Sequence, residues 1–255
     1  MLEASPRPRT PHREAFAASR RPWTVILNDL LRPIPALAPT YGWRDVPIEP
    51  VDEPLVAVAD IGPRVHDDPQ YIRMGLPGAP ARSWVREGVA DRLARVAAAL
   101  PDGLSLVVWD GYRPIATQAA LYRGYLDELV VIHPDWPADA LERAAARYVT
   151  PPSRDPTAPP PHLTGGAVDL TLGDGDGRPL DLGTHFDAFV PEAGARALED
   201  VPGRARELRR ILFWAMAEQG FTAYAEEWWH FDLGDQFWGV VSGRIARYAG
   251  ADAPE

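Results

Sequence analysis

The sequence predicts an α+β fold in which helices pack on a central antiparallel sheet. Helical and extended patterns alternate along the chain, but without the steady strand–helix–strand order that builds a parallel sheet. Near the C-terminal end, two extended segments at 221–224 and 228–233 follow each other closely enough to pair as neighbouring strands. The length of 255 residues suits one large domain better than two.

The N-terminal region carries little periodic pattern. Residues 1–22 are rich in Pro and Arg, and we expect them to form a flexible arm, an irregular extension of the single domain at 23–255. Within that domain, residues 23–80 hold short apolar runs interrupted by Pro, which predict a few strands and long loops.

The rest of the domain shows clearer elements. Apolar residues recur at spacings of three and four after Ser83, which can cap a helix, and this helix should end at Pro101. Pro114 suits the first turn of another helix. The remaining elements are predicted as strand 104–109, helix 114–131, helix 138–148, Pro-rich loop 150–161, strand 166–172, helix 204–219 and strands 221–224 and 228–233.

Composition excludes several classes of function. A net charge of −10 argues against nucleic-acid binding, because a phosphate backbone needs clustered Lys and Arg. With no Cys in the chain, disulfides, thiolate metal ligands and a Cys nucleophile are all absent. No stretch approaches the roughly 18 apolar residues of a membrane span. Ser19-Arg20-Arg21 resembles a twin-arginine signal, but no clean apolar segment follows it, so we expect a cytoplasmic protein.

His162 and Asp169 form the first candidate pair of metal ligands. Paired glycines, Gly165 and Gly166, lie between them and disfavour a helix. The glycines permit a tight turn from a loop into a strand, so that Asp169 can point back toward His162. A catalytic zinc site needs such converging imidazoles and carboxylates, with one coordination position open for water. The alternative is a surface His with an unrelated turn Asp.

Glu227 and His230 form the second candidate pair, separated by Trp228 and Trp229. On an extended strand or a turn, His230 can bind a metal while Glu227 addresses a water beside it. The bulky aromatic neighbours would exclude solvent and lock both side chains. The alternative is a Trp-rich core strand that contains a Glu and a His by chance.

Together the two segments resemble the D-alanyl-D-alanine dipeptidases of the VanX type, whose pattern is S-x-H-x-x-G-x-A-x-D followed by E-x-W-H. The resemblance covers residues 55–235, and its matching positions are His162, Gly165, Ala167, Asp169, Glu227, Trp229 and His230. The chain departs from the pattern at Pro160, which replaces a Ser that lies near the amino end of the substrate in the family.

Two further segments are similar to the family. Asp110 to Pro114 looks like the segment that carries a catalytic Arg, so the resemblance implies that Arg113 stabilises the transition state. Gly183 to Asp187 looks like the stretch whose Asp receives the substrate ammonium, a role that falls to Asp187; Tyr71 would contact the substrate. Without the resemblance, Arg113 fits a surface ion pair at a helix start and Asp187 fits a turn cap.

The resemblance implies one zinc ion per chain, bound by His162, Asp169 and His230, with Glu227 as the general base for a metal-activated water. The expected activity is hydrolysis of a small peptide of the D-Ala-D-Ala type. Two alternatives stay open: a zinc carboxypeptidase or endopeptidase acting on cell-wall peptides, and a catalytically inactive binding module on the same scaffold. The pattern leaves oligomeric state and substrate stereochemistry undecided.

Overall fold

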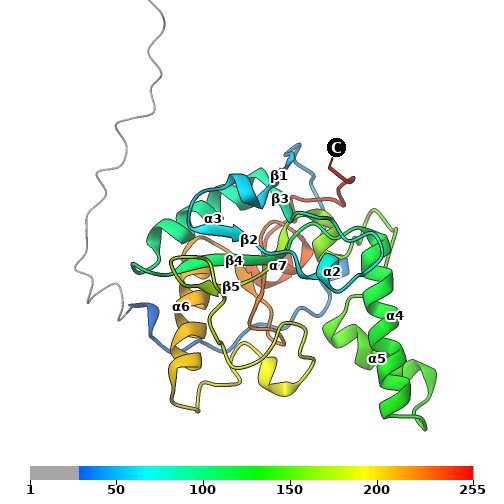
Figure 1. The fold of residues 1–255 in the computed structure, drawn as a ribbon. Helices are drawn as coiled ribbons and strands as arrows, with labels where there is room; N and C mark the ends of the chain where they lie inside the picture. The colour runs from blue at the N-terminus through cyan, green and yellow to red at the C-terminus, as the bar shows by residue number, and fades with distance from the viewer. Residues whose placement is uncertain (1–28, 255) are drawn as a thin grey trace, which may run out of the picture.

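A five-stranded sheet lies at the centre of the computed structural model, which describes residues 29–254 (Figure 1). The predicted arm at 1–22 and the twin-arginine-like segment lie outside the described residues. In spatial order the strands are β2 (Val65–Asp67), β4 (Ser105–Asp110), β5 (Ala167–Gly173), β7 (His230–Asp232) and β6 (Thr222–Ala223). A separate two-stranded sheet pairs β1 (Leu55–Ala57) with β3 (Trp84–Arg86).

Three of the four strand pairs in the central sheet are antiparallel, and the α+β fold is confirmed. The predicted closing strands also pair with each other, as β6 and β7. The edge strand β2 runs parallel to β4, which the sequence did not predict. A parallel pair needs a long crossover connection, and the segment between these two strands provides one because it includes a long helix.

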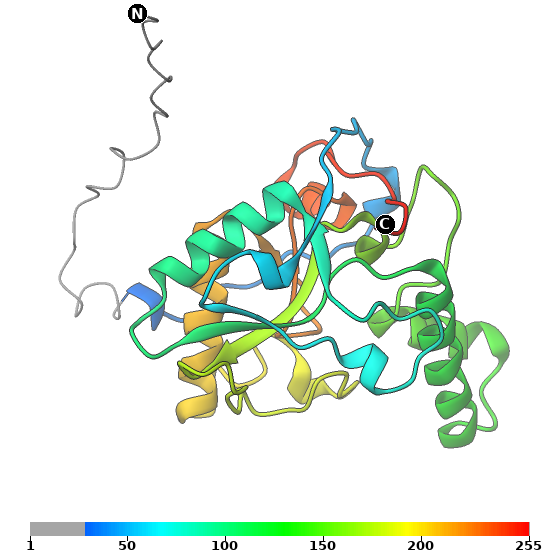
Figure 2. The same ribbon diagram turned by 45° about the horizontal axis from the view of Figure 1, so that its top comes forward.

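The longer helices lie on two sides of the molecule. The bounds of all the helices are α2 Gln70–Arg73, α3 Glu87–Ala99, α4 Ile115–Ile132, α5 Ala138–Tyr148, α6 Arg204–Glu218 and α7 Gln236–Ser242, with short 3₁₀ turns η1 Trp43–Asp45, η2 Val58–Asp60, η3 Pro161–Thr164 and η4 Pro191–Ala193. In Figures 1 and 2, α4 and α5 stand on the opposite side of the molecule from α3 and α6. None of the helices within 29–254 has the length and apolar character that crossing a membrane requires.

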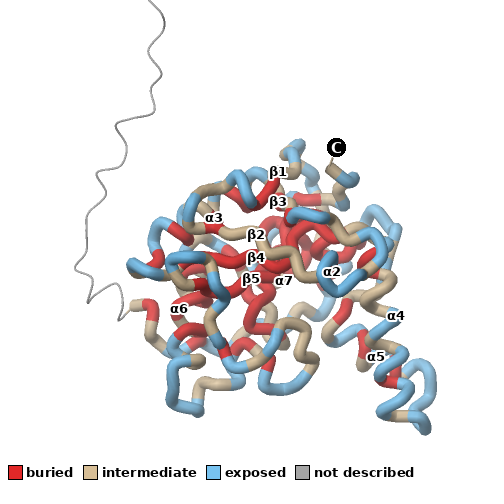
Figure 3. The backbone as a smooth tube through the Cα atoms, in the orientation of Figure 1, coloured by how far each residue is buried: buried red, intermediate tan, exposed pale blue. Residues whose placement is uncertain are grey.

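The core lies between the sheet and helices α3 and α6. Val89 and Leu93 of α3 and Leu212 and Met216 of α6 join one buried apolar cluster with strands β4 and β5. Both strands are buried along their whole length, although β5 carries Asp169 and Thr171 between its apolar residues. Figure 3 shows the contrast with the α4–α5 hairpin, whose outer end is exposed. The core therefore holds β5 rigidly, and β5 carries Asp169.

Two expectations about elements were wrong. The segment from Trp84 to Arg86 forms strand β3 instead of the first helical turn, and α3 starts at Glu87. Ser83 is not a helix cap; its N–H donates to the carboxylate of Asp67 at 3.1 Å. The short helix α7 was not predicted, although Asp235 caps it by accepting the N–H of Trp238 at 2.8 Å.

Candidate metal centre and substrate pocket

Three acidic and imidazole side chains form a row across the central sheet. Asp110 at the end of β4 is the register partner of Asp169 in β5, and Asp169 is the register partner of His230 in β7. The register shifts between Val108 and Asp110, an irregularity that re-aims the end of β4. Directly paired residues point to the same face of a sheet, so segments far apart in sequence bring these groups together.

His162 reaches the same point from the 3₁₀ turn η3. Gly165 ends that turn with a φ of 71°, in the left-handed region that glycine adopts without strain. A Cβ on Gly166 would lie 2.7 Å from the carbonyl oxygen of Leu233, so only glycine permits this close approach. The turn predicted between His162 and Asp169 is thus present, and it returns the chain toward the sheet.

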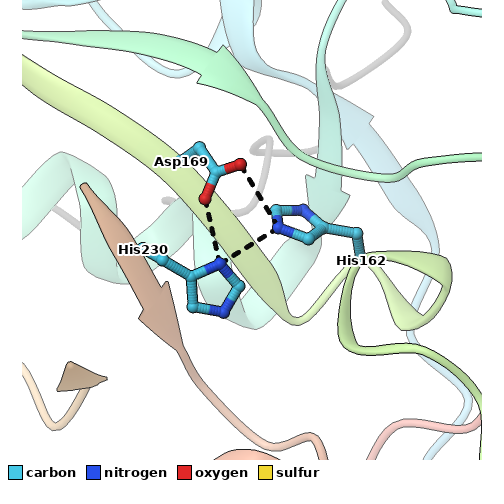
Figure 4. Close-up of side chains that lie close together, drawn as sticks. All are labelled: His162, Asp169 and His230. Carbon is cyan, nitrogen blue, oxygen red and sulfur yellow. Dashed lines mark hydrogen bonds and ion pairs between the residues drawn. The ribbon is translucent and has the colours of Figure 1, made fainter. Parts of the chain in front are cut away.

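The side chains of His162, Asp169 and His230 converge on one point (Figure 4). His162 Nε2 lies 3.1 Å from His230 Nδ1 and 3.4 Å from an Asp169 oxygen, and the other Asp169 oxygen lies 2.9 Å from His230 Nδ1. A tetrahedral zinc ion with bonds of about 2.0–2.1 Å separates its ligand atoms by about 3.3 Å. The three donors therefore fit a zinc ion in both chemistry and spacing.

In each imidazole, the ring nitrogen that faces away from the other donors has a partner of its own. His162 Nδ1 donates to the carbonyl oxygen of Gly111 at 2.9 Å, and His230 Nε2 lies 2.9 Å from a carboxylate oxygen of Asp232. Because these nitrogens act as donors, the lone pairs of His162 Nε2 and His230 Nδ1 face the centre. Such outer partners orient metal-binding imidazoles and make them more basic.

The electrostatics of the centre favour a cation. Burial by itself lowers the pKa of His230, but the carboxylates of Asp232 and Asp169 outweigh burial and raise that pKa well above its usual value. Burial alone would raise the pKa of Asp169, yet His162 and His230 hold it well below its usual range. A divalent ion bound between these groups would supply the positive charge that the carboxylates favour, in place of a proton on an imidazole.

Arg113 lies beside the three converging donors and is buried, which removes the alternative of a surface ion pair. Its Nε donates to Asp110 at 2.8 Å, its Nη1 to Gln118 at 3.0 Å, and its Nη2 to the Tyr71 hydroxyl at 3.1 Å and to Asp169 at 3.2 Å. Burial lowers the pKa of Arg113, but Tyr71 and the carboxylates outweigh this and raise it. The guanidinium is therefore a fixed positive charge in a fixed orientation.

Glu227 and Asp187 bring two more carboxyl groups to the site. Burial raises the pKa of Glu227 well above its usual value, and it raises the pKa of Asp187 to about 7. Arg113 and Tyr71 oppose this rise in the pKa of Asp187. Within residues 29–254, Asp187 is also the single non-glycine residue with a positive φ, 53°. Such a strained conformation persists only where the surroundings enforce it, and it is frequent at functional sites.

Comparison with known proteins identifies the family. The family model described as D-ala-D-ala dipeptidase, of peptidase family M15, matches residues 54–249. The chain belongs to this peptidase family. It is 30% identical over 226 residues to a D-alanyl-D-alanine dipeptidase of Synechocystis sp., covering 78% of this chain and 90% of the relative. It is also 32% identical over 154 residues to the Escherichia coli protein of the same name, covering 60% and 68% of the two chains.

As a member of this family the chain is a peptidase, and hence a hydrolase. The seven residues singled out from the sequence line one pocket. They are Tyr71, Arg113, His162, Asp169, Asp187, Glu227 and His230. Their convergence makes this pocket the candidate active site of a peptidase that acts on small substrates.

Some residues of the site escaped the sequence analysis. Gln118 and Tyr224 line the pocket from α4 and from the segment after β6, and no motif marks either of them. Asp110 was part of a matched segment but was given no role. Asp232 could have been found from the sequence. It follows His230 by two residues, and residues two apart on a strand point to the same face of the sheet.

Proposed function

We propose that this chain is a zinc-dependent dipeptidase that hydrolyses a short peptide of the D-Ala-D-Ala type. The observation that carries the proposal is the buried convergence of His162, Asp169 and His230 in one pocket with Glu227. The names of the relatives, all D-alanyl-D-alanine dipeptidases, support the same substrate class.

His162, Asp169 and His230 would hold the zinc ion. Two imidazoles and one carboxylate are a donor set of catalytic zinc sites, which leave a fourth position for water or substrate. When bound, zinc supplies a Lewis acid that polarises the substrate carbonyl and makes water easier to deprotonate. Asp110, which lies 3.2 Å from His162 Nδ1, and Asp232, which lies 2.9 Å from His230 Nε2, would keep the two imidazoles oriented.

Glu227 would be the general base. Its carboxylate accepts a proton from the attacking water and then delivers that proton to the nitrogen of the leaving amine. Burial raises the pKa of this carboxyl and so strengthens it as a base, while the positive charges of His230 and Arg113 act in the opposite direction.

Arg113 would stabilise the negative charge that develops on the carbonyl oxygen. Four of its five N–H groups are held by Asp110, Gln118, Tyr71 and Asp169. One N–H on Nη1 has no partner among the described residues and is available to the substrate. Because the other bonds fix the guanidinium in advance, little reorganisation is needed during the reaction.

Asp187 would pair with the free ammonium group of the substrate, and Tyr71 would orient that carboxylate. A carboxylate in this position favours peptides whose amino end lies one residue before the scissile bond. Longer N-terminal extensions would leave the carboxylate of Asp187 without its cationic partner, at an energetic cost. This pairing supports a dipeptidase over an endopeptidase.

A substrate screen with metal analysis tests the proposal. The protein is loaded with zinc, its metal content is measured, and D,D-, L,D- and L,L-dipeptides are compared with N-acetylated dipeptides and longer peptides. We expect one zinc per chain, hydrolysis of D-Ala-D-Ala, loss of activity with a chelator and poor turnover of N-acetylated substrates. Rapid cleavage of longer peptides, with no activity on free dipeptides, would overturn the proposal in favour of a carboxypeptidase or endopeptidase.

A further inference from the structure

The pocket contains a second guanidinium that the proposed chemistry does not use. Among the described residues that line the pocket, Arg113 and Arg147 carry the permanent positive charges. Arg113 is buried and committed to the centre, whereas the side chain of Arg147 at the end of α5 is 56% exposed. Arg147 is therefore the cation that an incoming ligand can reach directly.

Glu226 fixes the position of the Arg147 side chain but uses only part of its hydrogen-bonding capacity. The Nε and Nη2 atoms of Arg147 both donate to the same oxygen of Glu226, at 2.9 and 2.6 Å. Its Nη1 has no partner among the described residues, which leaves two N–H groups on one edge of the guanidinium. Glu226 thus fixes the direction of the side chain and leaves a donor pair available for an anion.

The backbone of Arg147 is also tied to the metal centre. The hydroxyl of Tyr224 donates to the carbonyl oxygen of Arg147 at 2.6 Å. The ring of Tyr224 in turn lies 5.7 Å, centroid to centroid, from the ring of His230. One aromatic ring therefore separates the end of α5 from a proposed zinc ligand, so Arg147 belongs to the wall of the site.

The charges of a dipeptide make the role of Arg147 specific. A free dipeptide carries an ammonium group, a scissile carbonyl and a terminal carboxylate, which lies about 3.5 Å beyond the scissile bond in an extended chain. Asp187 is the proposed partner of the ammonium group, and the zinc ligands and Arg113 surround the carbonyl. Arg147 pairs with Glu226 and not with Asp187, so the guanidinium of Arg147 and the carboxyl of Asp187, which line the same pocket, do not neutralise each other.

We infer that Arg147 binds the C-terminal carboxylate of the substrate and makes the enzyme selective for peptides that end one residue after the cleaved bond. This inference rests on the proposed function. A guanidinium and a carboxylate form charge-assisted hydrogen bonds with defined geometry, which supply orientation as well as affinity. Arg147 is thus a specificity-determining residue on the leaving-group side.

The test compares a dipeptide that the zinc-loaded wild type hydrolyses with its C-terminal amide, in wild type, Arg147→Met and Arg147→Lys. We expect the wild type to favour the free acid by about tenfold or more in kcat/KM, mainly through KM. Arg147→Met should bring the ratio of acid to amide close to one, and Arg147→Lys should keep part of the preference.

Arg143→Met is the matched control, because it removes the same charge from the same helix. Arg143 is exposed, pairs with Asp139 and does not line the pocket, so this variant should keep the wild-type ratio. A wild-type ratio in Arg147→Met, with normal circular dichroism, overturns the inference while leaving the proposed function intact. Absence of hydrolysis of every dipeptide by the zinc-loaded wild type overturns both.

Discussion

Asp169 and His230 are direct cross-strand partners in β5 and β7, and their side chains meet at 2.9 Å. The sheet register itself therefore assembles two of the three proposed zinc ligands. A shift of one residue in this pairing would turn one of the two side chains to the other face of the sheet. The paired strands therefore hold these two side chains of the candidate metal centre in place.

Asp232→Asn should weaken zinc binding by about 10–100-fold. Asp232 lies behind His230 and stabilises the imidazole in the orientation that directs Nδ1 to the centre. Asn keeps the shape of the side chain but removes the negative charge. Competition with a chromophoric chelator measures the affinity, and Asp176→Asn on an exposed turn serves as the control. Unchanged affinity in Asp232→Asn would contradict the orienting role.

Glu227→Gln should keep stoichiometric zinc and lose turnover by about 10²–10⁴-fold, because an amide cannot accept the proton of the attacking water. Glu227 does not belong to the three converging donors, so metal content should stay at the wild-type level. Steady-state kinetics with metal analysis on the same sample separates these effects. Glu142→Gln, on the exposed face of α5, is the control; near wild-type turnover in Glu227→Gln would exclude this residue as the base.

Much of the fold was predictable because many of its elements carry their own pattern. Helix α5 matches the predicted range 138–148, and α6 ends one residue before the predicted end at 219. Strand β3 and helix α7 were missed for a physical reason. A three-residue strand has no periodicity of its own and exists because β1 pairs with it, while α7 depends on a cap and on tertiary packing.

The candidate site, like the fold, could be predicted from the sequence only in part. The glycine turn after His162 has a local cause and could be predicted from spacing. The register of Asp169 with His230 depends on strands separated by 61 residues along the chain, and only the resemblance to a family suggested it. No sequence pattern indicated a role for Arg147, because its position in the pocket wall depends on contacts with Glu226 and Tyr224.

Asp187→Asn should change how the stability of the metal-free protein depends on pH. The pKa of Asp187 is raised to about 7 in the folded protein, compared with about 3.9 in an unfolded chain. The folded state therefore binds this proton more tightly, and the associated stability is present below about pH 4 and lost as the pH rises toward 7. Denaturant unfolding in chelator should show the variant more stable than wild type at pH 8 by up to about 4 kcal/mol, with the difference closing at pH 4. A constant difference across this range would show that Asp187 does not titrate in this way.

Arg209→Met should lower the free energy of unfolding by about 2–4 kcal/mol, because it leaves buried carbonyl groups without donors. Arg209 in α6 is buried and donates to the carbonyl oxygens of Leu182, Glu192 and Gly194, at 2.7, 3.0 and 2.9 Å. These carbonyls flank the loop that presents Asp187, so the same substitution should also raise KM for free dipeptides. Urea unfolding and steady-state kinetics measure the two effects, with Arg204→Met, exposed on the same helix, expected within about 0.5 kcal/mol of wild type. A loss of stability with unchanged KM would show that Arg209 supports the fold without positioning the Asp187 loop.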